Sequence, residues 1–348
     1  MPFRSGFVCI LGRPNAGKST LLNALVGEKL AIISPKPQTT RNRIQGVVHV
    51  PNRKGKGKHR GNDGGQIVLI DTPGVHKPDS SLGRKMMVEV REALEGCDLV
   101  LVIMDVTRKF DPRDQFALDL LRGPKTKAFL ILNKVDLIRE KSKLLPLIEQ
   151  YRKLYPFAEV VPISALKRKG LDALLDMVIA SLPAGPAYFP EDQITDQPAR
   201  FMAAEIIREQ VLLNTSEEIP YATTVIVDNF EEGARLTRIA ATIYCEREGQ
   251  KGILVGKGGQ MLKKIGTSAR LQIERMMVTK VFLELYVKAE PGWRDSRRFV
   301  EELDWRRQLE HRMLERGTPA LRTQEPSSEE RRVSADAGAD HDRNQTED

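Results

Sequence analysis

The sequence contains little that would cross-link the chain, hold a structural metal or anchor it in a membrane. Its three cysteines, Cys9, Cys97 and Cys245, lie far apart without the paired spacing of a disulfide framework or a zinc site, and the histidines are equally scattered. No apolar stretch reaches the ~20 residues of a membrane span, and the first apolar run is too short for a secretory signal. We therefore expect no structural metal and a soluble protein in a reducing, cytoplasmic compartment.

Length and charge predict two domains and an anionic partner. A chain of 348 residues exceeds the ~100 to 200 residues usual for one domain. The net charge is +8, but residues 323–348 hold three Arg against eight Asp and Glu, so residues 1–322 carry +13. That excess favours an anionic partner, although scattered Lys and Arg can equally form a solvated surface.

The first half alternates between short apolar runs and segments with helical periodicity. This rhythm indicates a parallel sheet covered by helices on both faces. Such a sheet binds ligands at the carboxyl ends of its strands. The predicted strands are residues 7–11, 67–71, 99–104, 128–132 and 159–163, and the predicted helices include 85–95, 143–154 and 171–182.

Three segments have the composition of loops or tails. Residues 51–66, with five Lys or Arg against one Asp, predict a flexible loop that could touch nucleic acid, although a solvated insertion is the simpler interpretation. Four prolines in residues 183–198 indicate a linker. Residues 318–348 predict a disordered tail. Between linker and tail we expect a compact α+β domain with helices at 199–213, after GKGG and at 294–316, and strands at 222–230, 236–247 and 281–288.

A phosphate-binding motif follows the first predicted strand. Residues 12–20, GRPNAGKST, match GxxxxGK[ST] between an apolar strand and a helical stretch, which is the context the motif requires. Gly12 and Gly17 let backbone N–H groups wrap phosphate oxygens, and the helix N-terminus adds a favourable dipole. Lys18 would contact the β and γ phosphates, and the Ser19 hydroxyl could bind Mg²⁺.

Three further motifs follow later strands and predict guanine specificity. Asp71 begins DTPG, which places a carboxylate near the metal and a glycine N–H near a γ phosphate. The carboxylate of Asp136, in NKVD, can accept from N1–H and the 2-amino group of guanine, a donor pair that adenine lacks. A backbone N–H in SAL can reach guanine O6. The candidate GTP-binding residues are Gly12, Arg13, Pro14, Asn15, Ala16, Gly17, Lys18, Ser19, Thr20, Asp71, Thr72, Pro73, Gly74, Val75, Asn133, Lys134, Val135, Asp136, Ser164, Ala165 and Leu166.

The polar stretch SPKPQTTRNRIQG suits a mobile loop that becomes ordered around γ phosphate and Mg²⁺. Thr39 and Thr40 are both candidate ligands, and we favour Thr40, together with Ser19 and Asp71. Val75 stands where many GTPases place a water-orienting glutamine. Its isopropyl group cannot hold that water, so we expect slow intrinsic hydrolysis or a differently supplied group.

A GxxG turn marks the second half. GKGG, residues 256–259, lies between two predicted helices, and the second helix carries Leu262, Ile265, Ala269, Ile273 and Met276 as a core-facing stripe. Residues 257–280 hold six positive charges against one negative. In a KH module such a turn clamps RNA by close backbone approach, although GxxG alone also fits a helix-capping turn. The candidate RNA-binding residues are Gly256, Lys257, Gly258, Gly259, Lys263, Lys264 and Arg270.

Together these motifs resemble the Era family of bacterial ribosome-assembly GTPases over nearly all of residues 5–316. GRPNAGKSTLLNAL, SPKPQTTRNRIQG, DTPGVHKP, NKVD and SAL are similar to its nucleotide motifs, and EEIPYATTV, GILVGKGG and the Trp293 region to its C-terminal half. Relatives with two GTPase domains fit less well, because this chain has a single P-loop. The 51–66 insertion and the acidic tail depart from the family pattern.

The resemblance implies an α/β P-loop GTPase domain with a doubly wound, mostly parallel sheet, followed by an α+β type II KH domain. We expect a GTPase domain over 1–183, a linker over 184–198, a KH domain over 199–317 and an acidic tail over 318–348. The implied partners are GTP or GDP, 16S ribosomal RNA near its 3′ end and the 30S subunit, with peripheral association at the inner membrane, no DNA and a monomeric state. Potassium is implied besides Mg²⁺, with Asn15 and Thr39 as candidate ligands.

Two other functions remain open from the residues alone. The chain could be an RNA-binding protein whose GTPase half is only a scaffold, but the intact Lys18, Ser19 and Asp71 argue against this. It could instead be a P-loop kinase for a small molecule, but NKVD and SAL recognise guanine and leave no evident site for a substrate hydroxyl.

Overall fold

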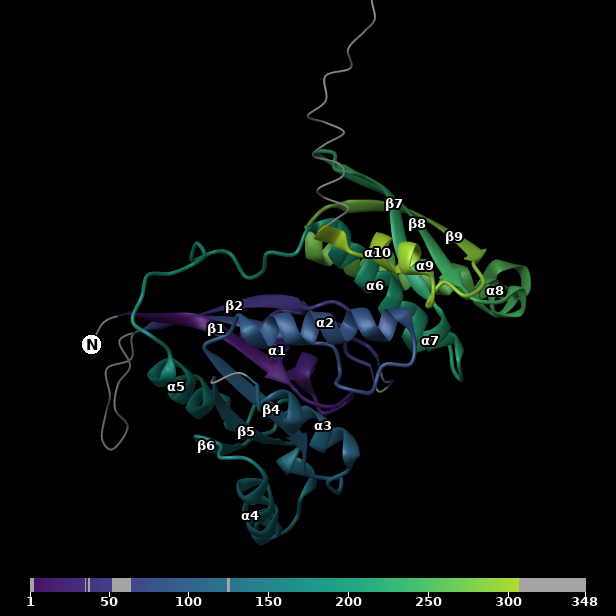
Figure 1. Cartoon of the computed structure of the whole chain (residues 1–348). Coiled ribbons are helices and arrows are strands. Elements are labelled where there is room, and N and C mark those ends of the chain that lie inside the picture. The colour runs from purple at the N-terminus through teal and green to yellow at the C-terminus, as the bar shows by residue number, and fades with distance from the viewer. Residues whose placement is uncertain (1–2, 35, 37, 52–63, 124–125, 307–348) are drawn as a thin grey trace, which may run out of the picture. The chain divides into compact units, whose positions relative to one another are not determined.

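The computed structural model describes residues 3–34, 36, 38–51, 64–123 and 126–306, which form two β-sheets with their helices (Figure 1). Residues up to Leu303 belong to one compact unit. The first half contains β1 (Arg4–Leu11), α1 (Lys18–Val26), β2 (Ile44–Val50), β3 (Gly65–Asp71), α2 (Ser81–Glu95), β4 (Leu99–Asp105), α3 (Pro112–Leu120), β5 (Lys127–Asn133), the 3-10 turns η1 (Val135–Leu137) and η2 (Lys141–Lys143), α4 (Leu144–Leu154), β6 (Glu159–Pro162) and α5 (Leu171–Ser181).

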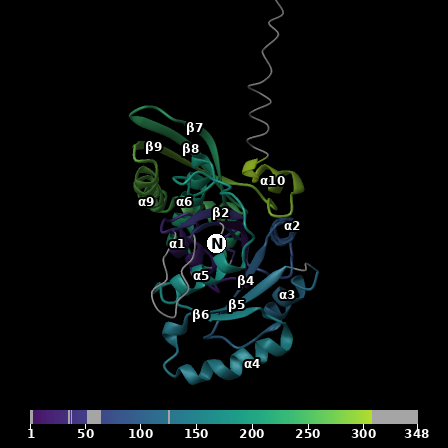
Figure 2. The ribbon, with the colours of Figure 1, turned by 90° about the vertical axis from the view of Figure 1, so that its left-hand side faces the viewer.

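The first sheet has six strands in the order β2-β3-β1-β4-β5-β6, and every neighbouring pair except β2–β3 is parallel. Alternate side chains of β1, β4 and β5 pack against α2, α3 and α4 on one face. Helices α1 and α5 contact β1, β2 and β3 on the other (Figure 2). The predicted doubly wound, mostly parallel sheet is therefore confirmed. The carboxyl ends of its strands provide the edge where the P-loop begins.

The stretch from residue 183 to residue 198 contains no helix or strand, and it is hydrogen-bonded to the first sheet. Val47 N–H donates to the Ile194 carbonyl (2.8 Å), and Thr195 Oγ1 donates to the Gln45 carbonyl (2.6 Å). These bonds satisfy backbone groups on the free edge of β2, which would otherwise be open to pairing with another chain.

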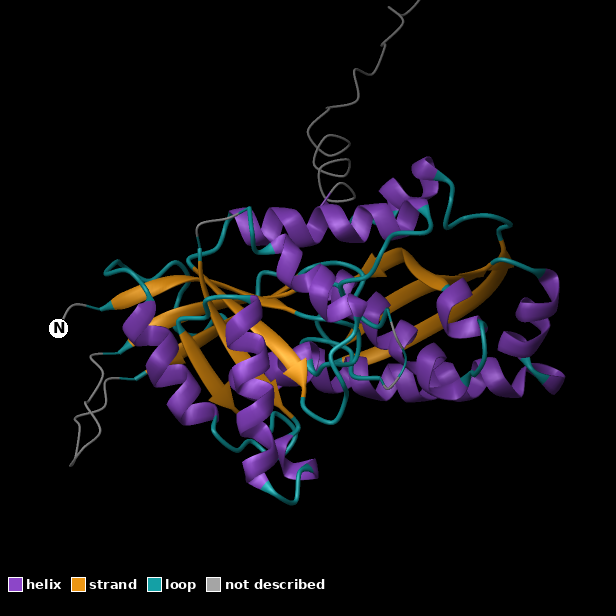
Figure 3. Cartoon of the chain, turned by 60° about the horizontal axis from the view of Figure 1, so that its bottom comes forward, coloured by secondary structure: helices purple, strands orange, loops and turns teal. Residues whose placement is uncertain are grey.

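The second half contains a three-stranded sheet in the order β7-β8-β9, with β7–β8 antiparallel and β8–β9 parallel. The apolar stripe predicted around Ile265, Ala269 and Ile273 is buried in one cluster with residues of β8 and α6. Figure 3 shows the helices and strands of both sheets by colour. Its elements are α6 (Ala199–Asn214), α7 (Ile219–Ala222), β7 (Thr224–Glu231), β8 (Leu236–Cys245), α8 (Glu248–Val255), the 3-10 turn η3 (Lys257–Gly259), α9 (Gln260–Met277), β9 (Lys280–Ala289) and α10 (Arg297–Glu302).

The prediction of one continuous helix over 294–316 is wrong. Helix α10 ends at Glu302, and Asp304 Oδ1 accepts a hydrogen bond from Arg306 N–H at 3.1 Å. An Asp that accepts from the backbone in this way is typical of a helix N-cap. The predicted helix is therefore interrupted at Leu303 and Asp304. Residues 307–316, the predicted tail 318–348 and residues 52–63 of the predicted loop lie outside the described residues. Within the described part of the chain, no helix is long and apolar enough to cross a membrane.

Candidate functional sites

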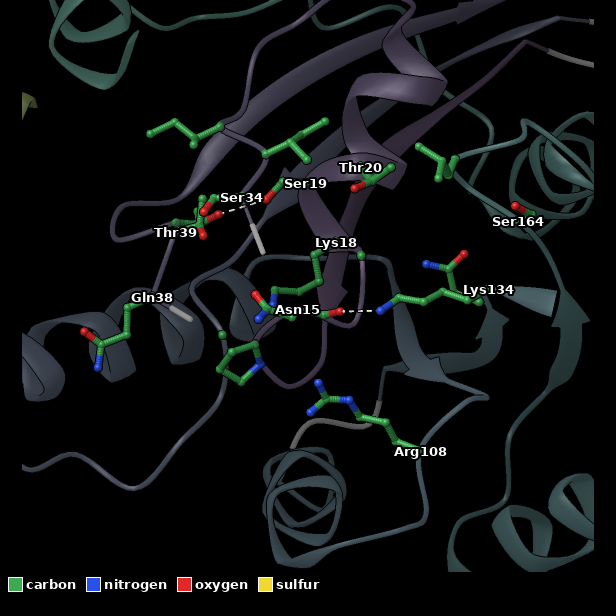
Figure 4. Close-up of a pocket in the computed structure, with 18 of the residues that line it drawn as sticks. Asn15, Lys18, Ser19, Thr20, Ser34, Gln38, Thr39, Arg108, Lys134 and Ser164 are labelled. Atoms are coloured by element: carbon green, nitrogen blue, oxygen red, sulfur yellow. Dashed lines mark hydrogen bonds between the residues drawn. The ribbon is translucent and has the colours of Figure 1, made fainter. Parts of the chain in front are cut away.

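A cavity of about 430 Å³ opens at the carboxyl ends of β1 and β5, where the P-loop, the loop after α1 and the loops after β5 and β6 meet. Figure 4 shows Asn15 and Lys18 of the P-loop between Gln38 and Thr39 on one side and Lys134 and Ser164 on the other. The lining residues are Pro14, Asn15, Gly17, Lys18, Ser19, Thr20, Ile32, Ile33, Ser34, Gln38, Thr39, Thr40, Gly74, Arg108, Asn133, Lys134, Asp136, Leu137, Ser164 and Leu166.

The P-loop curls around the ammonium group of Lys18. Lys18 Nζ donates to the carbonyls of Gly12 (3.1 Å) and Arg13 (3.2 Å). Burial lowers the pKa of Lys18, and the nearby Asp71 opposes that shift. Gly17 adopts φ 105°, and a Cβ there would lie 2.2 Å from Asn133 Nδ2. Glycine is therefore required where the loop enters α1.

Three side-chain oxygens, which are candidate metal ligands, converge beside Lys18. Ser19 Oγ lies 2.9 Å from Thr40 Oγ1 and donates to Asp71 Oδ2 at 2.7 Å, and Thr40 Oγ1 donates to the same oxygen at 3.2 Å. The other oxygen of Asp71, Oδ1, is buried without a hydrogen-bond partner in the described residues, and burial raises the pKa of Asp71. Two hydroxyls and an incompletely partnered carboxylate fit Mg²⁺, which prefers oxygen ligands.

Thr39 and Thr40, both candidate metal ligands from the sequence, have different surroundings in the structure. Thr40 Oγ1 faces Ser19 and Asp71, whereas Thr39 Oγ1 donates to the Lys36 carbonyl at 2.6 Å, although Thr39 still lines the cavity. This geometry favours Thr40 as the metal ligand.

Asn133 and Lys134 brace the base end of the cavity. Asn133 Nδ2 donates to the Ala16 carbonyl (2.9 Å), and Asn133 Oδ1 accepts from Ala165 N–H (3.0 Å). Lys134 Nζ donates to the Asn15 carbonyl (2.9 Å), the contact drawn as a dashed line in Figure 4. Asp136 is exposed and lines the cavity, so its carboxylate is available to a base.

Several candidate nucleotide residues support the cavity without lining it. Arg13 is buried and pairs with Asp111 (3.0 Å) and Asp114 (3.2 Å) of the α3 start. Thr72 Oγ1 donates to the Ile10 carbonyl (2.8 Å). The Val75 side chain is fully buried in the core that includes α2. The remaining candidates outside the lining are Gly12, Ala16, Asp71, Pro73, Val135 and Ala165.

Six residues that line the cavity were not predicted from the sequence. Gln38 and Ser34 belong to the stretch interpreted as a phosphate-sensing loop, so their place at the cavity could have been predicted from that stretch. Leu137 directly follows NKVD. The others are Ile32 and Ile33, in an apolar stretch without a motif, and Arg108, in the loop after β4.

The GKGG turn of the second half lies beside a groove with apolar and basic side chains. Gly258 adopts φ 58°, and a Cβ there would meet no atom within 4 Å, so the turn is open to a ligand. A cavity of about 380 Å³ beside it is lined by Gly259, Leu262, Lys263, Gly266, Thr267, Arg270, Leu283 and Leu285. Gly256, Lys257, Gly258 and Lys264 do not line it, and Arg270 is paired with Glu274 at 3.0 Å.

Fold and sites together define a P-loop GTPase followed by a KH domain. Residues 7–134 match the family model described as 50S ribosome-binding GTPase, and residues 218–294 match the KH domain model. The GTPase Era of Geobacter metallireducens is 50% identical over 87% of this chain and 98% of its own length, and that of Syntrophus aciditrophicus is 48% identical over 87% and 95%.

Two solved structures are similar over both halves. An Aquifex aeolicus Era variant bound to GDP and aluminium fluoride is 40% identical, covers 86% of this chain and 98% of its own, and has a TM-score of 0.79. An Era in complex with MgGDPNP and nucleotides 1506–1542 of 16S ribosomal RNA is 39% identical, with the same coverage and TM-score. The chain belongs to the Era family of GTPases.

Proposed function

We propose that this Era-family GTPase is a GTP-controlled switch that binds 16S ribosomal RNA near its 3′ end and acts in assembly and maturation of the 30S subunit. The observation that carries the proposal is the presence, in one chain, of a P-loop cavity and an open GKGG turn beside a groove that contains Lys263 and Arg270. A relative that covers 86% of the chain was solved with a GTP analogue and that part of 16S RNA.

The two ends of the first cavity bind different parts of the nucleotide, the phosphates at one end and the guanine base at the other. Lys18 and the P-loop amides bind the phosphates, and Asp136 accepts from guanine. Ser19, Thr40 and Asp71 would hold Mg²⁺, which offsets phosphate charge when bound. Val75 is buried and apolar, so no water-orienting group comes from this position. That supports slow intrinsic hydrolysis.

Finer properties belong to the same proposal. Asn15 and Thr39 line the cavity and are candidate potassium ligands. The free thiols of Cys9, Cys97 and Cys245 suit a reducing cytoplasm, and the charge of +13 on residues 1–322 favours peripheral contact with an anionic membrane as well as RNA. We propose a monomer with a GTPase domain over 1–183, a linker over 184–198, a KH domain over 199–317 and an acidic tail over 318–348.

The RNA assignment is tested by replacing Lys257 and Gly258 together with Asp. The change brings two carboxylates to the RNA backbone and removes one cation, and loss of a charge-assisted contact costs about 1.5 to 3 kcal/mol. Affinity for a 16S 3′-end RNA in filter binding should fall roughly a hundredfold. Asp tolerates left-handed backbone better than most residues, so the turn and GTP binding should survive.

The matched control replaces Arg122 and Gly123 with Asp, because this pair is also an exposed cation followed by glycine, at the end of α3 in the GTPase half. It makes the same charge change away from GKGG and should keep RNA affinity within about threefold. Unchanged RNA affinity in the Lys257/Gly258 variant would show that GKGG is only a structural turn.

A further inference from the structure

Arg41, the residue after the metal-site Thr40, is buried in the KH half of the molecule. Its side chain is 5% exposed. The guanidinium donates to the Thr223 carbonyl at 2.7 Å and, more weakly, to the carbonyls of Pro220 and Tyr221 at 3.4 and 3.3 Å. These carbonyls belong to α7 and its connection to β7. The contact therefore joins the metal-site loop to the KH domain's own backbone.

Trp293 contacts both Arg41 and the segment between α7 and β7, and it also packs against α2. The Arg41 guanidinium carbon lies 5.6 Å from the Trp293 ring centroid, within the range of a cation–π contact. Trp293 is fully buried, and its Nε1 donates to the Ala222 carbonyl at 2.9 Å. Leu82 and Met86 of α2 pack with it in one apolar cluster. Since α2 follows the DTPG motif, the segments that follow Thr40 and Asp71 in the sequence both contact this tryptophan.

The neighbouring residues of the loop are held by α6. Lys36 Nζ donates to the carbonyls of Leu212 and Thr215 at the carboxyl end of that helix. This is a favourable place for a cation, because the last carbonyls of a helix lack intrahelical partners. Arg208 donates to the Thr39 carbonyl and pairs with Glu205. The loop is therefore fixed on both sides of Thr40 by groups of the KH half.

Thr40 and Arg41 are consecutive, so their Cα atoms are only ~3.8 Å apart. Thr40 Oγ1 lies 3.2 Å from Asp71 Oδ2, while Arg41 reaches Thr223. Neither residue lies in a helix or strand. A backbone shift at Arg41 therefore also shifts Thr40, because one planar peptide unit joins them.

Some polar atoms at the contact between Arg41 and the KH domain lack a hydrogen-bond partner. Arg41 Nε, Arg208 Nη1 and Thr223 Oγ1 are buried and have no hydrogen-bond partner in the described residues. A buried donor without a partner costs free energy, so this contact offsets part of its own stabilisation.

We propose that Arg41 is a positioning residue for GTP hydrolysis: anchored by the carbonyls of residues 220–223 and by Trp293, it holds Thr40 at the site formed with Ser19 and Asp71. This inference rests on the proposed nucleotide and metal site and deepens it, because it makes the KH domain part of the structure that orders the metal ligand. By linkage, a ligand that shifts the α7–β7 connection changes affinity for the magnesium–GTP complex, and the reverse holds by the same factor.

The test compares four variants in the full chain: Arg41→Ala, Arg41→Lys, Trp293→Phe and Arg43→Ala. Arg43 is the matched control, because it is a loop arginine two residues away whose ion pairs are with Glu89 and Glu92 of α2. Three quantities are measured: affinity for a non-hydrolysable fluorescent GTP analogue with and without Mg²⁺, GDP affinity without Mg²⁺, and hydrogen exchange of backbone amides 38–44.

Arg41→Ala should lose about tenfold or more of the Mg²⁺-dependent tightening, keep Mg²⁺-free GDP affinity, and exchange faster at 38–44. Arg41→Lys should recover part of the tightening, because a cation remains for the Thr223 carbonyl. Trp293→Phe should change both readouts in the same direction but less, since an aromatic ring remains for Arg41 while the bond to Ala222 and part of the buried indole are lost. Arg43→Ala should resemble the original protein.

Normal Mg²⁺-dependent tightening and normal exchange in Arg41→Ala would overturn the proposal. If thermal melting shows that this variant is unfolded, Arg41→Lys and Trp293→Phe decide, and wild-type behaviour in both would overturn it equally. Absence of Mg²⁺-dependent tightening in the unmodified protein would instead refute the proposed metal site itself, so the two failures are distinguishable.

Discussion

Removing the amide of Asn133 should destabilise the GTPase half strongly. The side chain is 2% exposed and makes two hydrogen bonds to backbone groups, accepting from Ala165 N–H (3.0 Å) and donating to the Ala16 carbonyl (2.9 Å). In Asn133→Ala both backbone groups lose this partner. An unsatisfied buried polar group costs about 1 to 3 kcal/mol, so the free energy of unfolding should fall by roughly 2 to 5 kcal/mol.

The assay is denaturant unfolding without nucleotide, followed by a GTP titration under conditions where the variant is folded. Because Ala16 lies in the P-loop and Ala165 in the SAL loop, GTP affinity should fall as well, by about tenfold. Asn229→Ala is the control, since that asparagine is exposed and its side chain donates to Glu231 at 2.8 Å, and it should change stability by less than about 0.5 kcal/mol. A loss below 1 kcal/mol in Asn133→Ala would refute the bracing role.

The other nucleotide-site predictions concern direct contacts. Asp136→Asn should lower GTP affinity and raise XTP affinity in parallel titrations, because an amide can donate to the 2-oxo group of xanthine, and unchanged GTP affinity would rule out the guanine assignment. Lys18→Ala should weaken triphosphate binding about tenfold to a hundredfold, and Ser19→Ala should remove the tightening by Mg²⁺. Wild-type turnover of labelled GTP in both variants would contradict the mechanism.

The architecture was predictable because burial leaves a recognisable pattern of apolar residues in the sequence. Strands β4 and β5 are covered on both faces, so LVLVIM and AFLIL are continuous apolar runs. The P-loop and the GKGG turn were also visible, because backbone that wraps a ligand needs glycine at fixed positions. Helix α3 and the short α7 were not singled out. In α3, Ala117 and Leu118 are buried, a stretch too short to establish a helical period.

Local motifs were less informative about which side chains line the cavity. Arg13 and Asn133 both belong to nucleotide motifs. Arg13, however, forms ion pairs with residues at the start of α3. Asn133 does line the cavity, but both of its side-chain polar atoms bond to the backbone of neighbouring loops. A motif records that a residue type is required at a position, but not whether its partner is a ligand or a neighbouring loop. The partners of Arg13 lie about a hundred residues further along the chain, where only the folded structure identifies them.

The partners of Arg41, which lies between the two halves, could not be predicted from local sequence either. Its stretch has the polarity and the threonines of a phosphate-sensing loop, and that interpretation accounts for Thr40. It gives no reason to bury an arginine, because a charged side chain in a polar stretch is normally solvated. Burial becomes possible only when the carbonyls of residues 220–223 and the Trp293 ring come to the same place in the fold. No pattern within residues 34–46 contains that information, since the groups that accept Arg41 lie about 180 residues away.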